Sequence, residues 1–178
     1  MALPLRSPMR HNARLQHPLS AIEIFTMAQN KPKRAYVVRS SGIHGRGVFA
    51  TRTIRKNARI LEYRGTRTTW DIAAEQPYSD PDDPFHTFLF ELSDGRVIDA
   101  AEGGNAARWI NHSCDPNCET VEEGDRVFIH AVRTIRAGEE LTYDYQLVID
   151  EPITRRLRRQ YACGCGAEEC RGTMLQEG

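Results

Sequence analysis

The sequence predicts a mostly β domain, built from short strands with few helices. Its 178 residues are enough for one domain with a substantial hydrophobic core. The apolar residues fall into short segments rich in β-branched and aromatic side chains, and glycines or prolines separate these segments. A hydrophobic content of 40% and a charged content of 27% are typical of globular proteins. Together these observations predict short sheets whose strands pair with partners distant along the chain.

The first half of this domain should contain three strands and a helix. AYVVRS at residues 35–40 favours a strand because β-branched side chains cluster there. SGIHGRG at residues 41–47 is rich in glycine and is expected to turn the chain into a second strand, VFATRTI, at residues 48–54. RILEYRG at residues 59–65 predicts a third strand, and WDIAAEQ at residues 70–76 suits a short helix.

The second half continues the pattern after a polar loop. YSDPDDPF at residues 78–85 combines prolines with aspartates and is expected to be solvated. GGNAARWIN at residues 103–111 suits a short helix entered through glycines. Further strands are predicted at residues 87–92, 95–100, 126–132 and 140–145.

Residues 1–33 are expected to form a disordered basic tail, since they combine scattered prolines and basic residues with no sustained periodicity. The net charge is zero, but residues 1–60 hold 12 of the 24 lysines and arginines and a single acidic residue, Glu23. No apolar run approaches the roughly 18 residues that a membrane span needs. The N-terminus lacks a continuous hydrophobic segment with a cleavage site, so we expect no secretory signal and an intracellular protein.

The cysteines indicate a metal site. Cys163, Cys165 and Cys170 form a C-x-C-x4-C pattern, whereas a redox pair would need C-x-x-C spacing. Zinc prefers four tetrahedral ligands, and this pattern supplies three of them within a short segment. The fourth ligand is open among Cys114, Cys118 and a histidine, and the alternative to a metal site is a set of free surface thiols.

A second cluster of chemically active residues lies in RWINHSCDPNC, at residues 108–118. A nucleophilic role for Cys114 is disfavoured, because His112 is only two residues away and could not easily stand in line as its base. HGRG at residues 44–47 lets the backbone approach a ligand, but no helix pattern follows it, as a dinucleotide fingerprint would require.

Two tyrosines in GEELTYDY, at residues 138–145, form the third candidate feature. Tyr143 and Tyr145 are separated by one residue, so in a strand both would lie on the same face. They either pack as core aromatics with satisfied hydroxyl groups or line a narrow channel that a long side chain enters.

The motifs HGRGVFA, EYRG, GNAARWINHSCDPNC, GEELTYDY and CGCGAEEC follow one another across residues 42–172. In this order they resemble the SET domain followed by a post-SET zinc segment, a family of S-adenosylmethionine-dependent protein-lysine methyltransferases. The resemblance implies a SET domain over residues 34–149 and a basic linker with the post-SET zinc segment over residues 150–178. It also implies a pseudoknot that threads the NHSC segment near the TYDY segment, and a C-terminal tail closed by zinc.

The resemblance also implies roles for individual residues. Tyr145 matches the catalytic tyrosine, Tyr63 matches a tyrosine that lines the lysine channel, and Tyr143 occupies the position where phenylalanine or tyrosine tunes the number of methyl groups. The implied contacts of S-adenosylmethionine are His44, Gly45, Arg46, Gly47, Phe88, Asn111, His112 and Tyr145. The implied zinc ligands are Cys114, Cys163, Cys165 and Cys170, which leaves Cys118 free.

The chain departs from the family pattern at two points. Phe88 stands where many relatives have a tyrosine near the cofactor, so one hydroxyl contact is missing. No cysteine-rich pre-SET segment precedes the motifs, and residues 1–33 do not resemble one. The second difference limits what the chromatin-modifying relatives say about the substrate of this chain.

Methyl transfer to lysine suits this residue set. Free lysine has a pKa near 10.4, so the site must favour the neutral amine, which a desolvated channel beside a cationic sulfonium does. Tyrosine hydroxyls can then hold the amine in line, so Tyr145 is expected to orient rather than to act as a general base. A hydroxyl at Tyr143 would crowd an already methylated amine, which predicts low methylation states.

The partner implied by the resemblance is a protein that presents a lysine, with histones and other basic DNA-associated proteins as candidates. RRLRR at residues 155–159 is either a solvated helix face or linker, or a docking surface for an acidic protein or a nucleic-acid-bound substrate. It has no interleaved aromatic residues, so direct nucleic-acid binding is not supported. The alternative from another functional class is a catalytically inactive, zinc-stabilised SET-like module that only binds protein.

Overall fold

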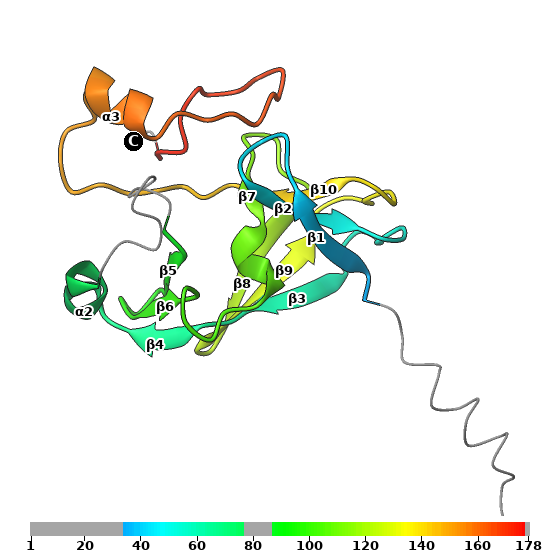
Figure 1. Cartoon of the computed structure of the whole chain (residues 1–178), viewed down its shortest axis with the longest axis horizontal. Helices are drawn as coiled ribbons and strands as arrows, with labels where there is room; N and C mark the ends of the chain where they lie inside the picture. The colour runs from blue at the N-terminus through cyan, green and yellow to red at the C-terminus, as the bar shows by residue number, and fades with distance from the viewer. Residues whose placement is uncertain (1–33, 77–86, 177–178) are drawn as a thin grey trace, which may run out of the picture. The chain divides into compact units, whose positions relative to one another are not determined.

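The computed structural model describes residues 34–76 and 87–176. The predicted tail over residues 1–33 and the predicted loop over residues 78–85 lie outside the described residues. Within these two ranges ten short strands form three small sheets, which confirms the mostly β class (Figure 1). In the described ranges, no helix has the length and apolar character that crossing a membrane would take.

The first sheet carries most of the segments singled out from the sequence. Its strand order is β1-β2-β10-β7, with β1–β2 and β2–β10 antiparallel and β10–β7 parallel. Four of the five residues of β2 are buried, as a strand in the middle of a sheet requires. The bounds of its strands are β1 Tyr36–Ser40, β2 Arg46–Ala50, β7 Asn111–His112 and β10 Glu140–Tyr143.

The other two sheets each have three strands. One has the order β3-β9-β8, and the central β9 buries an apolar run between its two neighbours. The other has the order β4-β6-β5. The bounds are β3 Arg59–Tyr63, β4 Thr66–Thr68, β5 Leu89–Glu91, β6 Val97–Asp99, β8 Cys118–Glu123 and β9 Arg126–Ala131. Together with β2 and β10 they enclose one hydrophobic core.

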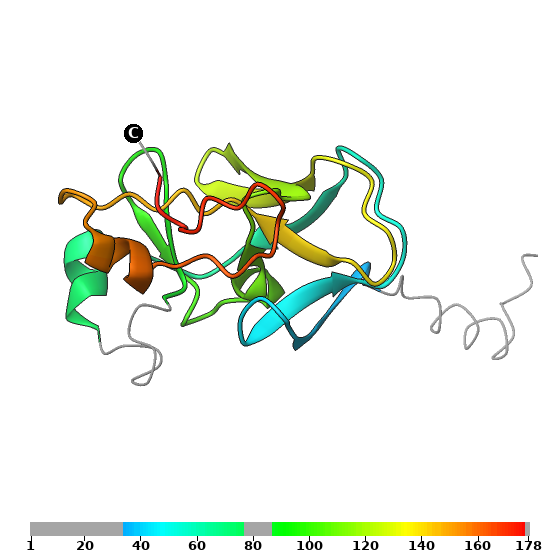
Figure 2. The same cartoon turned by 90° about the horizontal axis from the view of Figure 1, so that it is seen from above.

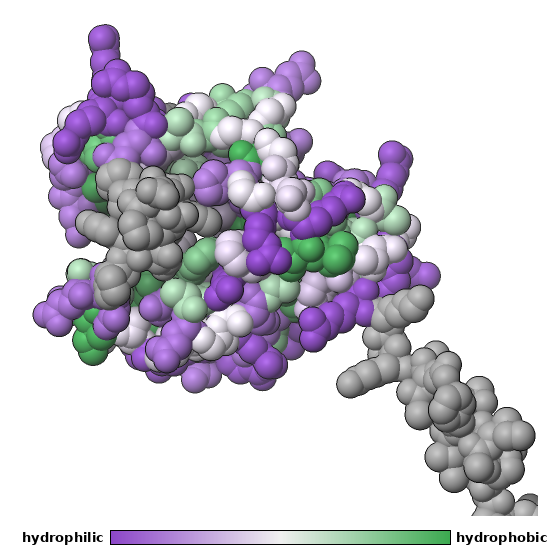
Figure 3. All heavy atoms as spheres, viewed as in Figure 1, coloured by the Kyte–Doolittle hydropathy of each residue, from purple (hydrophilic) through white to green (hydrophobic). Residues whose placement is uncertain are grey.

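Three short helices complete the described structure: α2 Trp70–Glu75, the 3-10 helix η1 Ala106–Trp109 and α3 Arg155–Gln160. Thr69, Asn105 and Thr154 cap their N-termini, each accepting a hydrogen bond from a backbone amide in the first turn. α3 buries only Leu157 and exposes its four arginines, where hydrophilic residues gather in Figure 3. The basic run is therefore a helix, and its role in docking stays a prediction.

The structure corrects several predicted boundaries. The strand expected at residues 48–54 starts at Arg46 and ends at Ala50, because Gly47 pairs with β1 inside the expected turn. Strands β4, β7 and β8 were not predicted, since they are short or rich in polar residues and are held by their neighbours. β10 ends at Tyr143, so Tyr145 lies beyond the strand rather than on it.

The segment after β10 returns across the first sheet (Figures 1 and 2). Leu147 and Leu175 form an isolated parallel bridge, and Ala162 and Thr173 form an antiparallel one. Leu157, Thr173 and Leu175 are each at most 3% exposed, so this segment has a small core of its own. A Cβ on Gly164 would lie 3.4 Å from the carbonyl oxygen of Ile43, which places the cysteine segment against the β1–β2 turn.

Candidate functional site

The two glycines of the HGRG segment, Gly45 in the β1–β2 turn and Gly47 in β2, have different roles. Gly45 has a φ of +42° and open space around it, so it allows the turn itself. Gly47 is buried, and a Cβ there would lie 2.1 Å from Oε1 of Glu140. Gly47 thus makes room for a carboxylate of the protein, while His44, Gly45 and Arg46 are exposed, and the approach of a ligand to both glycines stays a prediction.

Asn111 joins this turn to strand β7. Its buried side-chain amide donates to the carbonyl oxygens of His44 and Arg46 at 3.2 and 2.9 Å, and to Oε1 of Glu140 at 2.8 Å. The structure therefore brings Asn111 and the HGRG turn together, as the resemblance implied. The side-chain amide is engaged within the protein, so its evident effect is to fix the course of the turn.

His112 lies between the tyrosines and the cysteines. Its Nδ1 accepts a hydrogen bond from the backbone amide of Tyr145 at 3.1 Å and lies 3.4 Å from Oδ1 of Asp144. Its Nε2 lies 3.4 Å from the sulfur of Cys114. Burial lowers the pKa of His112, opposed by the Asp144 carboxylate, so the neutral ring is favoured. One imidazole thus contacts both halves of the site.

The three tyrosines come together from two places in the chain, Tyr63 from β3 and Tyr143 and Tyr145 from the end of β10 and the residues after it. The rings of Tyr143 and Tyr145 are 4.9 Å apart between centroids, and both phenols interact electrostatically with that of Tyr63. The hydroxyl of Tyr145 donates to the carbonyl oxygen of Ile110 at 2.7 Å, and that of Tyr63 donates to the carbonyl oxygen of Phe88 at 3.0 Å. The shared face expected for Tyr143 and Tyr145 is thus present, although the strand ends between them.

Burial raises the pKa of all three phenols above the ordinary value of 10. Neighbouring phenols raise the pKa of Tyr63 and Tyr145 further, and the carboxylate of Glu140 also acts on Tyr145. The hydroxyl groups are therefore protonated at neutral pH. In that state they can donate and accept hydrogen bonds, but they are poor general bases.

A pair of aromatic rings, Phe88 and Trp109, lies beside Arg46 at the end of the β1–β2 turn. The ring of Phe88 meets that of Trp109 edge-on at 5.0 Å between centroids. The guanidinium of Arg46 lies 4.7 Å from the Trp109 ring centroid and that of Arg108 lies 4.8 Å from it. Arg108 also donates to the carbonyl oxygen of Ala100 at 3.0 Å. Such cation–π contacts hold Phe88 and the turn to the same aromatic surface.

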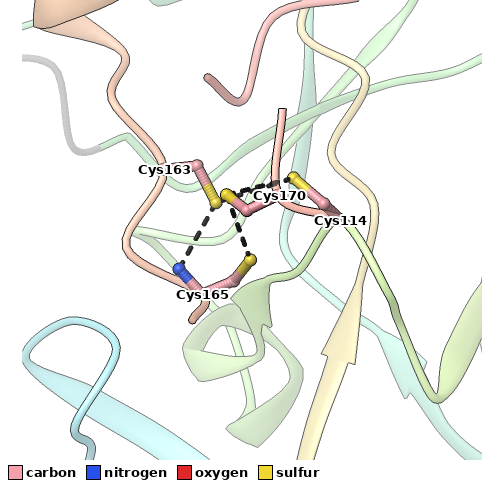
Figure 4. Close-up of side chains that lie close together, drawn as sticks. All are labelled: Cys114, Cys163, Cys165 and Cys170. Atoms are coloured by element: carbon pink, nitrogen blue, oxygen red, sulfur yellow. Dashed lines mark hydrogen bonds between the residues drawn. The ribbon is translucent and has the colours of Figure 1, made fainter. Parts of the chain in front are cut away.

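The four cysteines named from the resemblance form one cluster (Figure 4). The sulfurs of Cys114, Cys163, Cys165 and Cys170 all lie within 4.8 Å of one another. Those of Cys114 and Cys163 are 3.7 Å apart, those of Cys114 and Cys170 are 3.8 Å apart, and those of Cys165 and Cys170 are 3.6 Å apart. Tetrahedral zinc with bonds of about 2.3 Å would separate its sulfurs by about 3.8 Å. The cluster could therefore hold a metal ion.

Backbone amides surround the sulfurs of the cluster. The amides of Cys165, Ala167 and Gly172 point at cysteine sulfurs at distances of 3.3 to 3.5 Å. Burial raises the pKa of Cys114 and Cys163, whereas for Cys165 hydrogen bonds from backbone amides and neighbouring thiols outweigh burial and lower the pKa to about 6. Such amides orient sulfur ligands and offset their negative charge.

Cys118 lies apart from the cluster. It is 1% exposed, donates to Oδ1 of Asn117 at 3.3 Å, and burial raises its pKa to about 12. A protonated, buried thiol of this kind packs as a small apolar side chain.

An ion pair ties the tyrosine segment to the cysteine segment. Both guanidinium nitrogens NH1 and NH2 of Arg171 donate to the carboxylate of Asp144 at 2.7 Å. Burial raises the pKa of Asp144, but the Arg171 contacts outweigh it and hold that pKa below its ordinary value. The planar two-bond geometry is the strong form of this pair. It closes the C-terminal segment over the side of the site that carries Tyr145.

Sequence reasoning missed Glu140, Ser41 and Asn117, which connect the motifs. Asn117 donates to the carbonyl oxygen of Glu140 at 2.6 Å and accepts from the amide of Thr142 at 3.0 Å. Asn117 lies inside RWINHSCDPNC and Glu140 lies inside GEELTYDY. Residue spacing alone, however, does not distinguish a buried side chain that joins two segments from a polar residue on the surface. Ser41 carried no signal beyond its place next to a glycine.

Comparison with known proteins identifies the family that shares these segments. Residues 45–146 match the SET domain family. The chain is 37% identical over 157 residues to human histone-lysine N-methyltransferase 2B, a match that takes in 83% of this chain and 5% of that protein. It is 38% identical over 154 residues to the histone-lysine N-methyltransferase trr of Drosophila melanogaster, with 83% and 6% of the two chains covered.

A third relative is the H3 lysine-4 specific histone-lysine N-methyltransferase of Saccharomyces cerevisiae, 37% identical over 159 residues, with 85% and 14% covered. The chain thus spans between 5% and 14% of the length of these relatives. The match over residues 45–146 runs from the glycine turn through NHSC to the tyrosines, and these are the segments that the structure brings together. By this match the chain belongs to the SET domain family.

Proposed function

We propose that the chain is an S-adenosylmethionine-dependent protein-lysine N-methyltransferase. The observation that carries this proposal is the meeting of three protonated phenols, Tyr63, Tyr143 and Tyr145, beside the Asn111–His112 segment. Aromatic walls with few polar groups suit the aliphatic stem of a lysine, and the hydroxyls suit its amine. The relatives named as histone-lysine N-methyltransferases support the same reaction class.

The residues around the β1–β2 turn fit the methyl donor. His44, Gly45 and Arg46 are exposed, and Trp109 offers an aromatic face beside Arg46. We also expect the donor to contact the backbone of Gly47, which follows the turn. Further contacts are expected from Phe88, Asn111, His112 and Tyr145. When bound, S-adenosylmethionine supplies an electrophilic methyl group on a sulfonium. Phe88 brings no hydroxyl to it, in contrast to the tyrosine of many relatives.

The tyrosines act by position and by excluding water. Burial around Tyr63 and Tyr143 disfavours a charged ammonium, so the amine loses its proton before or on entry to the channel. The hydroxyl of Tyr145 is fixed on the carbonyl oxygen of Ile110, which holds its ring and lets its oxygen lone pairs orient an amine N–H. Tyr145 is the catalytic residue in this scheme, as an orienting group.

Zinc is the metal proposed for the cysteine cluster. Four thiolates in tetrahedral spacing suit zinc, and its binding free energy would order a segment that buries few apolar residues. Cys114 comes from the NHSC segment and the other three cysteines come from the C-terminal segment. The metal would therefore fasten that segment beside His112 and Tyr145.

The substrate class proposed is a protein that presents a lysine in a flexible segment. Histones or other basic DNA-associated proteins fit the excess of acidic residues over residues 61–178 and the names of the relatives. An enzyme of this kind would act in the cytoplasm or on the chromosome.

The rival is a zinc-stabilised SET-like module that binds protein without catalysis. Titration of the zinc-loaded protein with S-adenosylmethionine and with S-adenosylhomocysteine in a calorimeter separates the two. Saturable binding of both compounds at one site per chain is the expected result. Absence of binding by the zinc-loaded, folded protein would favour the inactive module.

A further inference from the structure

The side chain of Glu140 lies at the meeting point of three segments. It belongs to β10, which pairs with β2, and its carboxylate reaches across to the β1–β2 turn. Oε1 and Oε2 accept from the hydroxyl of Ser41 at 2.8 and 2.9 Å. Oε1 also accepts from Nδ2 of Asn111 at 2.8 Å. One carboxylate thus contacts the turn, β7 and its own strand.

The turn depends on these contacts for its shape. The hydroxyl of Ser41 accepts from the amide of Ile43 at 2.9 Å, and the amide of Ser41 donates to the carbonyl oxygen of Gly45 at 3.0 Å. Holding Ser41 therefore holds both bonds across the turn. The amide of Asn111, held by the same carboxylate, reaches the turn from its other end at His44 and Arg46.

Gly47 leaves room for this carboxylate because it has no side chain. A Cβ at Gly47 would lie 2.1 Å from Oε1 and 2.7 Å from Cδ of Glu140, both far inside contact distance. The glycine therefore has a partner 93 positions along the chain, and the two residues constrain each other. Ser41 contributes a second near contact, since its Cβ would lie 3.0 Å from the same added atom.

The charge of Glu140 matters as well as its shape. Its carboxylate raises the pKa of Tyr145, so its field reaches the tyrosine group. A carboxylate that accepts several hydrogen bonds makes each of them stronger than a neutral acceptor would. A negative charge just behind the turn also favours a cationic ligand in front of it.

From this geometry we infer that Glu140 is a positioning residue for the methyl donor: its carboxylate fixes the Ser41–Gly47 turn and Asn111 in the shape that the donor contacts. The inference rests on the proposed function for the identity of the ligand. It assigns no contact between Glu140 and the donor, because the carboxylate bonds to Ser41 and Asn111 and lies against the buried Gly47.

The test compares Glu140→Ala with Glu139→Ala as a matched control. Glu139 is the preceding residue, pairs with Arg133 at 2.7 Å and accepts from the amide of Arg136, away from the turn. Loss of charge-assisted bonds should weaken S-adenosylmethionine binding by Glu140→Ala about ten- to hundredfold, with kcat at saturating donor changed much less. Glu139→Ala should bind as the parent does, and Glu140→Gln should recover part of the affinity.

Two further measurements keep the inference falsifiable. In the donor-free protein, Glu140→Ala should speed hydrogen exchange at the amides of Ser41 and Ile43, whereas Glu139→Ala should not. Gly47→Ala should weaken donor binding strongly in the parent and much less in the Glu140→Ala background, because the clash partner is gone.

The outcomes separate the inference from the proposed function. Unchanged donor affinity in Glu140→Ala, or equal effects of Gly47→Ala in both backgrounds, would overturn the role of Glu140 while leaving the methyltransferase intact. If Glu140→Ala speeds exchange at the turn but the parent protein never binds the donor, Glu140 still fixes the turn and the proposed function is overturned.

Discussion

At the scale of single residues, buried polar side chains carry both the fold and the site. Asn111, His112 and Asn117 are each at most 6% exposed, and all three make hydrogen bonds to segments distant in the chain. Polar groups at such depth stabilise only when they are satisfied, and they specify one arrangement of the segments they join.

Asn117→Ala is expected to destabilise the protein by about 3 kcal/mol, because it leaves the amide of Thr142 and the carbonyl oxygen of Glu140 without a partner. Urea denaturation followed by circular dichroism measures the change. Asp115→Ala, two residues away and exposed, should stay within about 0.5 kcal/mol of the parent. Similar effects of the two substitutions would show that the hydrogen bonds of Asn117 to β10 do not stabilise the fold.

Tyr143 is expected to limit the number of methyl groups added. Its ring is buried against Tyr145, so its hydroxyl takes up room that a methylated amine would need. The parent protein should give mainly mono- and dimethyl-lysine at early times, and Tyr143→Phe should shift the products toward trimethyl-lysine. Mass spectrometry of a substrate peptide over a time course reads this directly. Trimethyl-lysine as the main early product of both proteins would refute the assignment.

At the scale of elements, the cysteine cluster, the ion pair between Arg171 and Asp144 and several backbone bonds hold the C-terminal segment. The amides of Leu147 and Gln176 donate to the carbonyl oxygens of Met174 and Leu147 at 3.1 and 2.9 Å. Cys165→Ser or a chelator is expected to lower methyl transfer at least about tenfold and to speed exchange at these two amides.

Cys118→Ala is the control for the metal prediction. It removes a thiol from the core but not from the cluster, so it should keep about one zinc per chain, measured by elemental analysis, and lose only modest stability. Full activity in metal-free parent protein would contradict the role given to the C-terminal segment.

An ion pair between strands β3 and β9 makes a pH-dependent contribution to the stability of the fold. Glu62 on β3 accepts from Nε and NH2 of Arg126 on β9 at 2.9 Å, and these bonds lower the pKa of Glu62 to about 2. A carboxyl whose pKa is lower in the folded state stabilises the fold above its unfolded pKa, near 4.5, and ceases to do so as the pH falls toward 2. The side chain of Arg126 is 52% exposed, so solvent screening limits the gain to about 1 kcal/mol.

Glu62→Gln should therefore lower the free energy of unfolding by about 1 kcal/mol at pH 7, and the difference should vanish near pH 2. Urea midpoints of the two proteins at a series of pH values measure it. A difference that persists unchanged at low pH would assign the effect of the substitution to packing instead of charge.

Much of the element pattern is predictable from the sequence, and the reasons are local. Residues 35–40 and 126–132 show strand-like composition, and β1 and β9 lie there. CETVEE in β8 has no apolar alternation, because both faces carry polar residues, and it is held by pairing with β9 and by bonds from Ser93 and Arg59 to its glutamates. Three members of the cysteine cluster followed from the C-x-C-x4-C pattern and Cys114 followed from the family resemblance, whereas the contact between Glu140 and Gly47 is one that no sequence period encodes.

At the scale of the whole molecule, three small sheets present loops and strand ends that no single sheet could bring together. Tyr63 comes from β3, Tyr143 from β10 and the cysteines from the NHSC and C-terminal segments. The compact unit over residues 34–178 thus contains the proposed channel and the cysteine cluster in one continuous piece.

The most direct test of the account is methyl transfer by the zinc-loaded protein, with Tyr145→Phe run beside it. The protein is incubated with S-adenosylmethionine and a panel of basic proteins including histones, and methyl-lysine is read by mass spectrometry. The account predicts methyl-lysine on at least one protein and a loss of about a hundredfold or more in Tyr145→Phe, with the fold and zinc content kept. Methyl-lysine formed equally by both proteins, or none from protein that binds the donor on any member of the panel, would contradict it.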